Sequence, residues 1–200
     1  MTTYKKKLDL VISGVGGQGA ILASDIIGKS AVLEGIPIRA AETHGMAQRG
    51  GSVVNHIRLG CELGSMIPLH EGDVLLALEP AEALRYIDLL SVDGVVIVNT
   101  QPVLPITVTS GGDEYPGVPD IVKVLKSTHK VVAFNASELA IKAGHPQTMN
   151  VVMVGAASNY LPMSEDLLID CIKGMVPPKT VDINVRAFKL GREQVSSHNK

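Results

Sequence analysis

Short apolar runs alternate with longer amphipathic segments along most of this chain. Runs rich in valine, isoleucine and leucine are typical of strands, whereas apolar residues that recur at helical spacing indicate helices. The pattern predicts strands at residues 8–12, 36–42, 52–59, 73–79, 95–99 and 130–135. It predicts helices at residues 19–34, 80–90, 119–126, 136–143, 150–161, 164–173 and 180–196.

The alternation of strands with helices favours an α/β fold. Most of the strand segments are apolar throughout, as expected where helices cover both faces of a parallel sheet. Right-handed crossovers between parallel strands then lead to a doubly wound, mainly parallel, Rossmann-like sheet with helices on both faces. The 200 residues are enough for one such domain with a substantial core, so we expect a single domain.

Three segments depart from this simple pattern. Residues 52–59 alternate apolar and polar positions, which predicts a strand with one exposed face that carries His56 and Arg58. Residues 102–117 are rich in proline, glycine and polar residues, and they predict either a long excursion or a short hairpin. Gly191 is expected to weaken the end of the last helix, because glycine is a poor helix former.

The net charge of −2 and the isoelectric point of about 6.3 provide no basic field, so we expect no nucleic acid and no membrane partner. No apolar run approaches the roughly 18 residues that a membrane span requires. The N-terminal residues also lack the pattern of a signal peptide, so we expect a cytoplasmic protein. Cys61 and Cys171 are the only cysteines, too few for an iron–sulfur cluster or a structural zinc ion, and we expect no metal site.

Residues 14–19 read Gly-Val-Gly-Gly-Gln-Gly between a predicted strand and a predicted helix. This is G-x-G-x-x-G spacing, in which the first glycine turns the chain, the second lets the backbone approach a ligand, and the third packs the helix against the strand. The N–H groups at the start of such a helix also attract anions. The first candidate binding loop therefore consists of Gly14, Gly16, Gly17, Gln18 and Gly19.

A dinucleotide site would need an acidic residue about 20 positions beyond the glycines, at the end of the second strand, to hold a ribose. Glu42 stands near that position. No further element of an NAD or FAD site is recognisable, and the glycine spacing on its own is a modest signal. The dinucleotide interpretation therefore remains an alternative.

Residues 42–51, Glu-Thr-His-Gly-Met-Ala-Gln-Arg-Gly-Gly, form the second candidate segment. Loops at the carboxyl ends of parallel strands are where α/β sheets bind ligands. Arg49 could present its planar guanidinium to a carboxylate or a phosphate. His44 could titrate, but no nucleophile–base arrangement is readable around it. The simpler interpretation is that both side chains bond to nearby loops or to a partner subunit.

Together these segments resemble the gamma-type domain of the 2-oxoacid:ferredoxin oxidoreductases. The resemblance rests on residues 14–19 and 42–54, with further agreement at 72–86, 94–100 and 150–156. It runs from about Leu8 to about Leu161, so we expect one gamma-type domain over residues 1–200, with a core at about 8–161 and C-terminal helices at 164–196. The stretch His-Gly-Met-Ala-Gln-Arg-Gly-Gly is similar to the branch of the family that acts on aryl pyruvates such as indolepyruvate.

The resemblance implies a division of labour between subunits. In this family thiamine diphosphate attacks the keto carbon of the 2-oxoacid, iron–sulfur clusters pass electrons towards ferredoxin, and coenzyme A receives the acyl group. This chain has neither the Gly-Asp-Gly signature for thiamine and magnesium nor cluster cysteines. The resemblance therefore places thiamine diphosphate, magnesium and the clusters in a larger alpha-type partner subunit. We expect no catalytic residue and no bound cofactor in this chain alone.

What the resemblance carries over to this chain is a surface that meets coenzyme A, another anion, or the partner. Its residues are the five of the glycine loop together with His44, Gln48, Arg49, Gly50 and Gly51. Three alternatives stay open: a pyruvate- or 2-oxoglutarate-type gamma subunit, a stand-alone NAD(P)- or flavin-dependent Rossmann oxidoreductase, and a scaffolding protein without chemistry.

Overall fold

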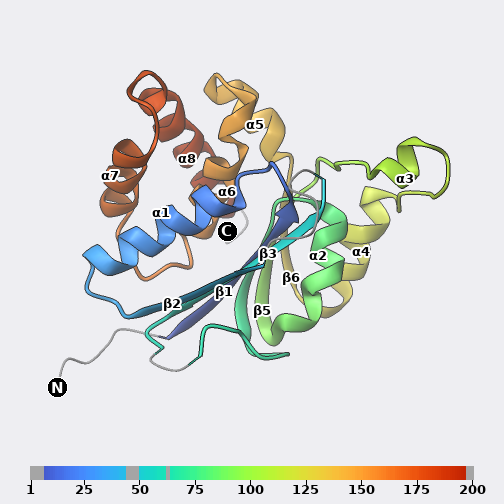
Figure 1. The fold of residues 1–200 in the computed structure, drawn as a ribbon, viewed down its shortest axis with the longest axis horizontal. Coiled ribbons are helices and arrows are strands. Elements are labelled where there is room, and N and C mark those ends of the chain that lie inside the picture. Colours follow the sequence, from blue (N-terminus) through green and yellow to red (C-terminus); the bar gives the residue numbers. More distant parts are fainter. Residues whose placement is uncertain (1–6, 44–49, 62–63, 197–200) are drawn as a thin grey trace.

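The computed structural model describes residues 7–43, 50–61 and 64–196, which form a sheet with helices on both faces (Figure 1). The strands are β1 (Leu8–Val15), β2 (Ile38–Thr43), β3 (Ser52–Leu59), β4 (Gly72–Ala77), β5 (Leu90–Asn99) and β6 (Lys130–Phe134). The helices are α1 (Ala20–Leu33), α2 (Pro80–Tyr86), α3 (Ile106–Thr109), α4 (Val118–Thr128), α5 (Ala136–Ala143), α6 (Met149–Ala157), α7 (Glu165–Met175) and α8 (Val181–Ser196). Short 3-10 turns at Ile87–Leu89, Pro146–Thr148 and Pro178–Thr180 adjoin α2, α6 and α8.

The strands follow the order β2-β3-β1-β4-β5-β6 across the sheet. The neighbours β1, β4, β5 and β6 run parallel, whereas β3 runs antiparallel to both β1 and β2. The α/β fold with a mainly parallel sheet is therefore confirmed, with β3 as the one reversed strand. The chain moves from β1 to one side of the sheet and from β4 to the other, so the topological switch point lies between β1 and β4.

Two clusters of buried apolar side chains form layers that hold the helices against the two faces of the sheet. Helices α1, α5, α6, α7 and α8 lie on one face, and α2 and α4 lie on the other (Figure 1). Successive side chains of β1 alternate between the layers: Leu10 and Ile12 belong to the first and Val11 to the second, all fully buried. A strand buried on both faces explains why its sequence is apolar without alternation.

Helix α6 lies within the first layer, and each of its nine residues is buried. Helix α8 crosses it so closely that a Cβ atom on Gly191 would lie 1.8 Å from the carbonyl oxygen of Val152. A Cβ on Gly155 would likewise lie 2.0 Å from the carbonyl oxygen of Phe188. Helix α8 continues through Gly191 to Ser196. Gly191 therefore allows two helices to approach, and it does not end the helix.

The prediction that β3 has an exposed face is wrong, because Val54–Leu59 are all buried. Arg58 donates from Nε and Nη2 to the two carboxylate oxygens of Asp9 at 2.9 and 3.0 Å. Residues 64–69 lie over His56 and Arg58: the N–H of Ile67 donates to His56 Nδ1 at 3.2 Å, and Arg58 Nη1 donates to the carbonyl of Met66 at 3.2 Å. His56 and Arg58 therefore belong to a buried ion pair and its covering loop.

Residues 102–117 form the predicted excursion, with the four-residue helix α3 in place of the alternative hairpin. The predicted bounds of β3 and α5 agree with the structure, and Ser164 begins α7 by accepting a hydrogen bond from the N–H of Leu167. Helices α7 and α8 pack onto α1 and α6, and the division into a core and C-terminal helices stays a prediction. Among the described helices, none combines the length and the apolar character needed to cross a membrane.

Candidate functional site

The glycine loop joins the end of β1 to the start of α1, as the spacing predicts. Gly17 and Gly19 have φ values of 102° and 80°, in the left-handed region that favours glycine. A Cβ atom on Gly19 would lie 2.4 Å from Asn150 Nδ2, the group that donates to the carbonyl of Gly19 at 3.1 Å. The third glycine of the motif therefore brings α1 close to α6, whereas the spacing predicts packing of the helix against the strand.

Gln18 links two strands across the switch point. Its Oε1 accepts a hydrogen bond from the N–H of Val15 at 2.9 Å, and its Nε2 donates to the carbonyl of Leu78 at 3.0 Å. A Cβ atom on Gly14 would lie 2.8 Å from Gln18 Oε1, so the first glycine makes room for this side chain. The crevice in which an open α/β sheet usually binds its ligand is thus bridged by the protein's own amide.

The two candidate segments meet in the structure. The N–H of Gly16 donates to the carbonyl of Gly51 at 2.8 Å, and the N–H of Gly50 donates to the carbonyl of Gly16 at 3.2 Å. This exchange extends the β1–β3 ladder beyond Val15, because Val15 pairs with Ser52 in the antiparallel register. The structure therefore brings together Gly16 of the first segment and Gly50 and Gly51 of the second. The other residues of the second candidate surface, His44, Gln48 and Arg49, lie outside the described residues.

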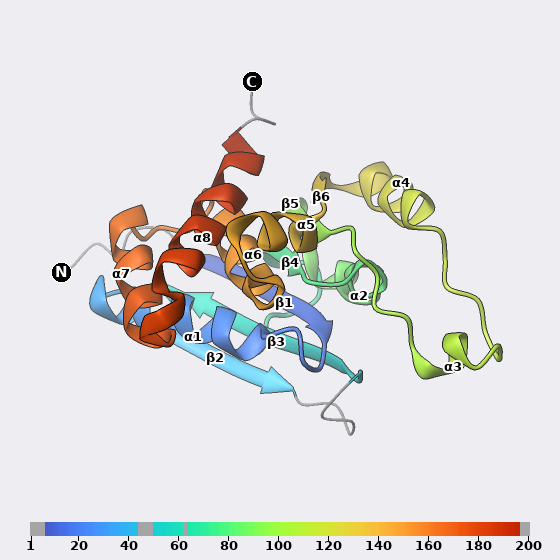
Figure 2. The ribbon, with the colours of Figure 1, turned by 90° about the horizontal axis from the view of Figure 1, so that it is seen from above.

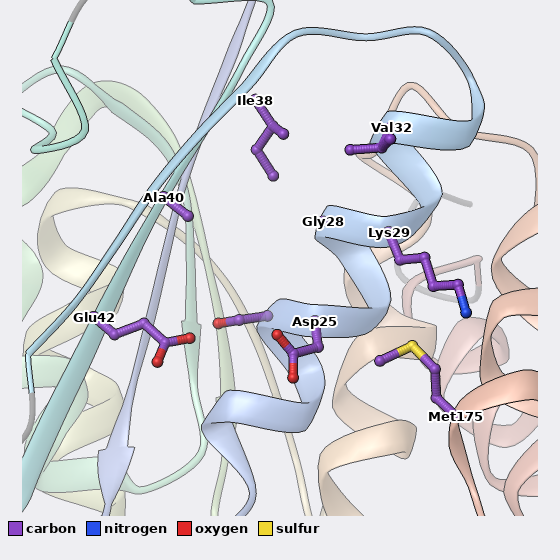
Figure 3. Close-up of a pocket in the computed structure, with 9 residues that line it drawn as sticks. Asp25, Gly28, Lys29, Val32, Ile38, Ala40, Glu42 and Met175 are labelled. Atoms are coloured by element: carbon purple, nitrogen blue, oxygen red, sulfur yellow. The ribbon is translucent and has the colours of Figure 1, made fainter.

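Glu42 does not lie beside the glycine loop. Strand β3 separates β2 from β1, which displaces Glu42 by one strand spacing, about 4.8 Å, from the place next to β1 that a ribose-binding acid occupies. Glu42 instead lines a groove of about 330 Å³ between β2 and α1, where it points towards the helix that carries Asp25 (Figure 3). Apart from Met175 of α7, this groove is lined by residues of α1 and β2. The geometry therefore disfavours a dinucleotide across the switch point.

Two buried carboxylates lie at the start of α2, just beyond the end of β4. Glu79 is 1% exposed, and it accepts hydrogen bonds from the N–H of Glu82 at 3.0 Å and from the hydroxyl of Tyr115. Glu82 is 5% exposed, and it accepts from the hydroxyl of Ser52 and from Arg85 Nε. Burial and the hydrogen bond to Glu79 raise the pKa of Tyr115 well above its usual range, so the phenol remains a donor.

Sequence reasoning assigned no role to Glu79 or Tyr115. The available signal was Glu79 directly before Pro80, because an acidic residue followed by proline at the first helical position indicates a helix start. Nothing in the sequence indicated that Tyr115, far along the chain, would reach this carboxylate.

The ion pair between Asp9 of β1 and Arg58 of β3 lies towards the opposite end of the sheet from the glycine loop. The hydrogen bond to Asp9 raises the pKa of Arg58, and the guanidinium therefore stays charged. Burial, and next the positive charge of Arg58, lower the pKa of His56. His56 Nδ1 accepts a backbone hydrogen bond from Ile67, and its neutral form fits that role.

Within residues 7–43, 50–61 and 64–196 no three His, Cys, Asp or Glu side chains gather to hold a metal ion. Cys61 is partly exposed and Cys171 is buried. The glycine loop, Gly50–Gly51 and the ends of β4 and β5 together form one edge of the sheet, joined by hydrogen bonds of Gly16 and Gln18.

Known sequences place these features in a family. A family model described as pyruvate ferredoxin/flavodoxin oxidoreductase matches residues 9–194. The indolepyruvate oxidoreductase subunit IorB of Archaeoglobus fulgidus is 44% identical over 194 residues, which cover 96% of each chain. The IorB subunit of Thermococcus kodakarensis is 42% identical over 191 residues, 93% of this chain and 95% of the relative. The 2-oxoglutarate synthase subunit KorC of Methanothermobacter marburgensis is 28% identical over 195 residues, 96% and 98% of the two chains.

Solved structures share the fold. The keto/oxoacid ferredoxin oxidoreductase gamma subunit of Geobacter sulfurreducens matches with a TM-score of 0.71 and 24% identity, over 95% of this chain and 99% of that one. The 2-oxoglutarate:ferredoxin oxidoreductase of Magnetococcus marinus matches with a TM-score of 0.73 and 20% identity, over 96% of this chain and 32% of that one. With the family model covering nearly the whole chain, the resemblance drawn from the two glycine segments is confirmed: the chain belongs to the pyruvate ferredoxin/flavodoxin oxidoreductase family.

Proposed function

We propose that this chain is the subunit without cofactors of an oxidoreductase that decarboxylates aryl 2-oxoacids such as indolepyruvate to acyl-coenzyme A. The observation that carries the proposal is the identity of 44% and 42% with two IorB subunits over nearly the full length, against 28% with a KorC subunit. This difference favours the aryl-pyruvate branch over a pyruvate- or 2-oxoglutarate-type gamma subunit. The partner in this proposal is a larger alpha-type subunit, with ferredoxin as electron acceptor and the cytoplasm as compartment.

Thiamine diphosphate, magnesium and iron–sulfur clusters belong to the partner subunit in this proposal. Thiamine diphosphate supplies the nucleophile for decarboxylation when it is bound there. The residues of this chain do not fit these groups, because two cysteines are too few to hold an iron–sulfur cluster and the described part gathers no metal-ligating cluster. The contribution of this chain is to bind and position.

The edge that carries the glycine loop is the surface we assign to this role. Hydrogen bonds between Gly16 and the pair Gly50–Gly51 fix the backbone that directly follows Arg49. Arg49 and the N–H groups at the start of α1 are the groups proposed to meet an anion, either a phosphate of coenzyme A or an acidic loop of the partner.

The role of Arg49 is tested by kinetics. Arg49→Ala is expected to raise the KM for coenzyme A, or to weaken assembly if the anion belongs to the partner. Arg49→Lys is expected to be nearly as damaging, because lysine cannot form a bidentate contact. Unchanged assembly together with unchanged coenzyme A kinetics would overturn the anion assignment and leave the subunit role standing.

The subunit role is tested by co-expression with the alpha-type subunit, followed by size-exclusion chromatography. Activity is then assayed with indolepyruvate, coenzyme A and a one-electron acceptor, with pyruvate and 2-oxoglutarate as competing substrates. The expected result is co-elution, and activity on indolepyruvate that is lost when this chain is omitted. Preference for pyruvate or 2-oxoglutarate would move the chain to another branch of the family. Failure to associate would remove the subunit role.

A further inference from the structure

Residues 101–117, called the arm below, leave the end of β5 and return into α4. The arm contains the short helix α3, and α3 has no buried residue. Figure 2 shows α3 extended away from the sheet and from the other helices. Only Pro102, Val108 and Tyr115 of the arm are partly covered, and its other residues are exposed. The arm therefore gains little stability from the body of this chain.

A single buried carboxylate fixes the base of the arm at both ends. Glu79 Oε1 accepts a hydrogen bond from the N–H of Val103, near the start of the arm, at 3.3 Å. The same oxygen accepts from the hydroxyl of Tyr115, near its end, and that hydroxyl accepts from the N–H of Ala81 at 3.2 Å. Burial of a carboxylate is costly unless hydrogen-bond donors surround it. The N–H of Val103 and the hydroxyl of Tyr115 are two of the donors that stabilise buried Glu79. The arm projects from a fixed base.

The outer part of the arm presents apolar side chains to water. Ile106 is 84% exposed, Leu104 48% and Val103 39%. Neighbouring exposed apolar side chains mark contact surfaces more often than isolated ones do. The formal charges of the arm are those of Asp113 and Glu114, with no lysine or arginine between residues 101 and 117. Its chemistry suits an apolar hollow that is bordered by basic side chains.

The arm is continuous with the edge that carries the glycine loop. Asn99, which is fully buried, accepts a hydrogen bond from the N–H of Gln101 at 3.2 Å. Asn99 Nδ2 donates to the carbonyl of Leu78 at 3.0 Å, and Gln18 Nε2 donates to the same carbonyl. One short chain of hydrogen bonds therefore connects the start of the arm to the glycine loop.

We propose that the arm is a docking element for the alpha-type partner subunit, with Ile106 and Leu104 inserted into an apolar hollow and with Asp113 and Glu114 facing basic side chains. This inference rests on the proposed function. A second copy of this chain is the less suitable occupant, because a two-fold contact between arms would bring like charges together. The relatives at 42% and 44% identity are themselves named as subunits, which supports the presence of another chain.

The test compares two apolar-to-acidic variants with nearly equal exposure. Ile106→Asp changes the arm, and Val92→Asp changes a residue of β5 outside the arm that is 85% exposed. Neither side chain is buried, so both variants are expected to keep the melting temperature of the isolated chain. Affinity for the purified alpha-type subunit is measured by titration. Ile106→Asp is expected to weaken it at least tenfold, and Val92→Asp less than twofold.

A third variant, Glu114→Gln, is expected to slow association and to reduce its dependence on salt, because rim charges act on the association rate. Equal affinity of Ile106→Asp and the unchanged chain would overturn the docking role, and so would equal losses in Ile106→Asp and Val92→Asp. If Ile106→Asp changes the oligomeric state of the isolated protein in solution, the arm is assigned to contacts between copies of this chain. If the unchanged chain itself fails to bind the alpha-type subunit, the proposed function fails, and the docking role fails with it.

Discussion

Individual polar side chains hold the edge of the sheet together. Gln18, Glu79 and Asn99 each satisfy backbone groups of segments that lie far apart in the sequence. Such bonds matter because a buried donor or acceptor that is left unpaired costs about 1–3 kcal/mol. The geometry of the candidate surface therefore depends on single residues.

Removal of the Gln18 amide tests this dependence. Gln18→Ala deletes the acceptor for the N–H of Val15 and one of the two donors to Leu78, so we expect a loss of about 1–3 kcal/mol in the free energy of unfolding. Gln147→Ala is the control, because Gln147 is exposed and its effect should stay within about 0.5 kcal/mol. Urea unfolding measures both, and equal effects would show that the bridge does not contribute to stability.

His56 predicts a pH dependence of stability. Burial and, to a smaller degree, the charge of Arg58 lower its pKa from 6.5, so the unfolded chain binds a proton more readily than the folded one. The contribution of neutral His56 is therefore fully present above pH 6.5, and it is lost as the pH falls through the folded pKa. We expect His56→Gln, which still offers an acceptor to Ile67, to lose less stability between about pH 7 and about pH 5 than the unchanged chain does. Stability is measured by urea unfolding at each pH, and an equal loss of stability in both proteins would contradict this prediction.

The elements of this fold are positioned by close backbone contacts as well as by apolar burial. Helix α6 is covered on all sides, and its contact with α8 leaves no room for side chains at Gly155 and Gly191. Strand β3, inserted between β1 and β2, places Gly50 and Gly51 against the glycine loop. Each arrangement brings together segments that are widely separated in the chain.

Two glycine-to-alanine substitutions, with opposite expected effects on stability, test the contact between α6 and α8. Gly191→Ala would place a Cβ 1.8 Å from the carbonyl oxygen of Val152, and we expect it to destabilise the chain by about 3 kcal/mol or more. Gly174→Ala in α7 meets only Lys29 Nζ at 3.8 Å, and it should stabilise by about 0.5–1 kcal/mol through lower unfolded-state entropy. Thermal unfolding measures both. A small effect at Gly191 would mean that α8 can move away from α6 at little cost.

At the scale of the whole molecule, the structure at the switch point differs from that of a dinucleotide-binding Rossmann protein. The Gln18 side chain bridges the crevice, and Glu42 lines a different groove. In the described residues the glycine motif serves close packing, since Gly19 lies against Asn150 of α6.

A ligand titration tests this conclusion. NADH, NADP and FAD at about 1 mM are expected to leave the melting temperature of the isolated chain unchanged. A site with a Kd of about 10 μM would stabilise the chain by about 2.7 kcal/mol at that concentration, which corresponds to roughly 5–11 °C for a protein of this size. A shift of that magnitude, or a flavin retained on purification, would restore the stand-alone oxidoreductase alternative.

The sequence by itself determined the fold class, most element positions and the two glycine segments. These are local properties: apolar runs buried on both faces, helical periodicity, and glycine spacing at a strand-to-helix turn. The tertiary structure alone decided that β3 runs antiparallel with both faces buried, that Gly16 bonds to Gly50 and Gly51, and that Tyr115 reaches Glu79. Those features depend on which distant segments become neighbours, and the local pattern of Ser52–Leu59 is the same whether solvent or Asp9 faces Arg58.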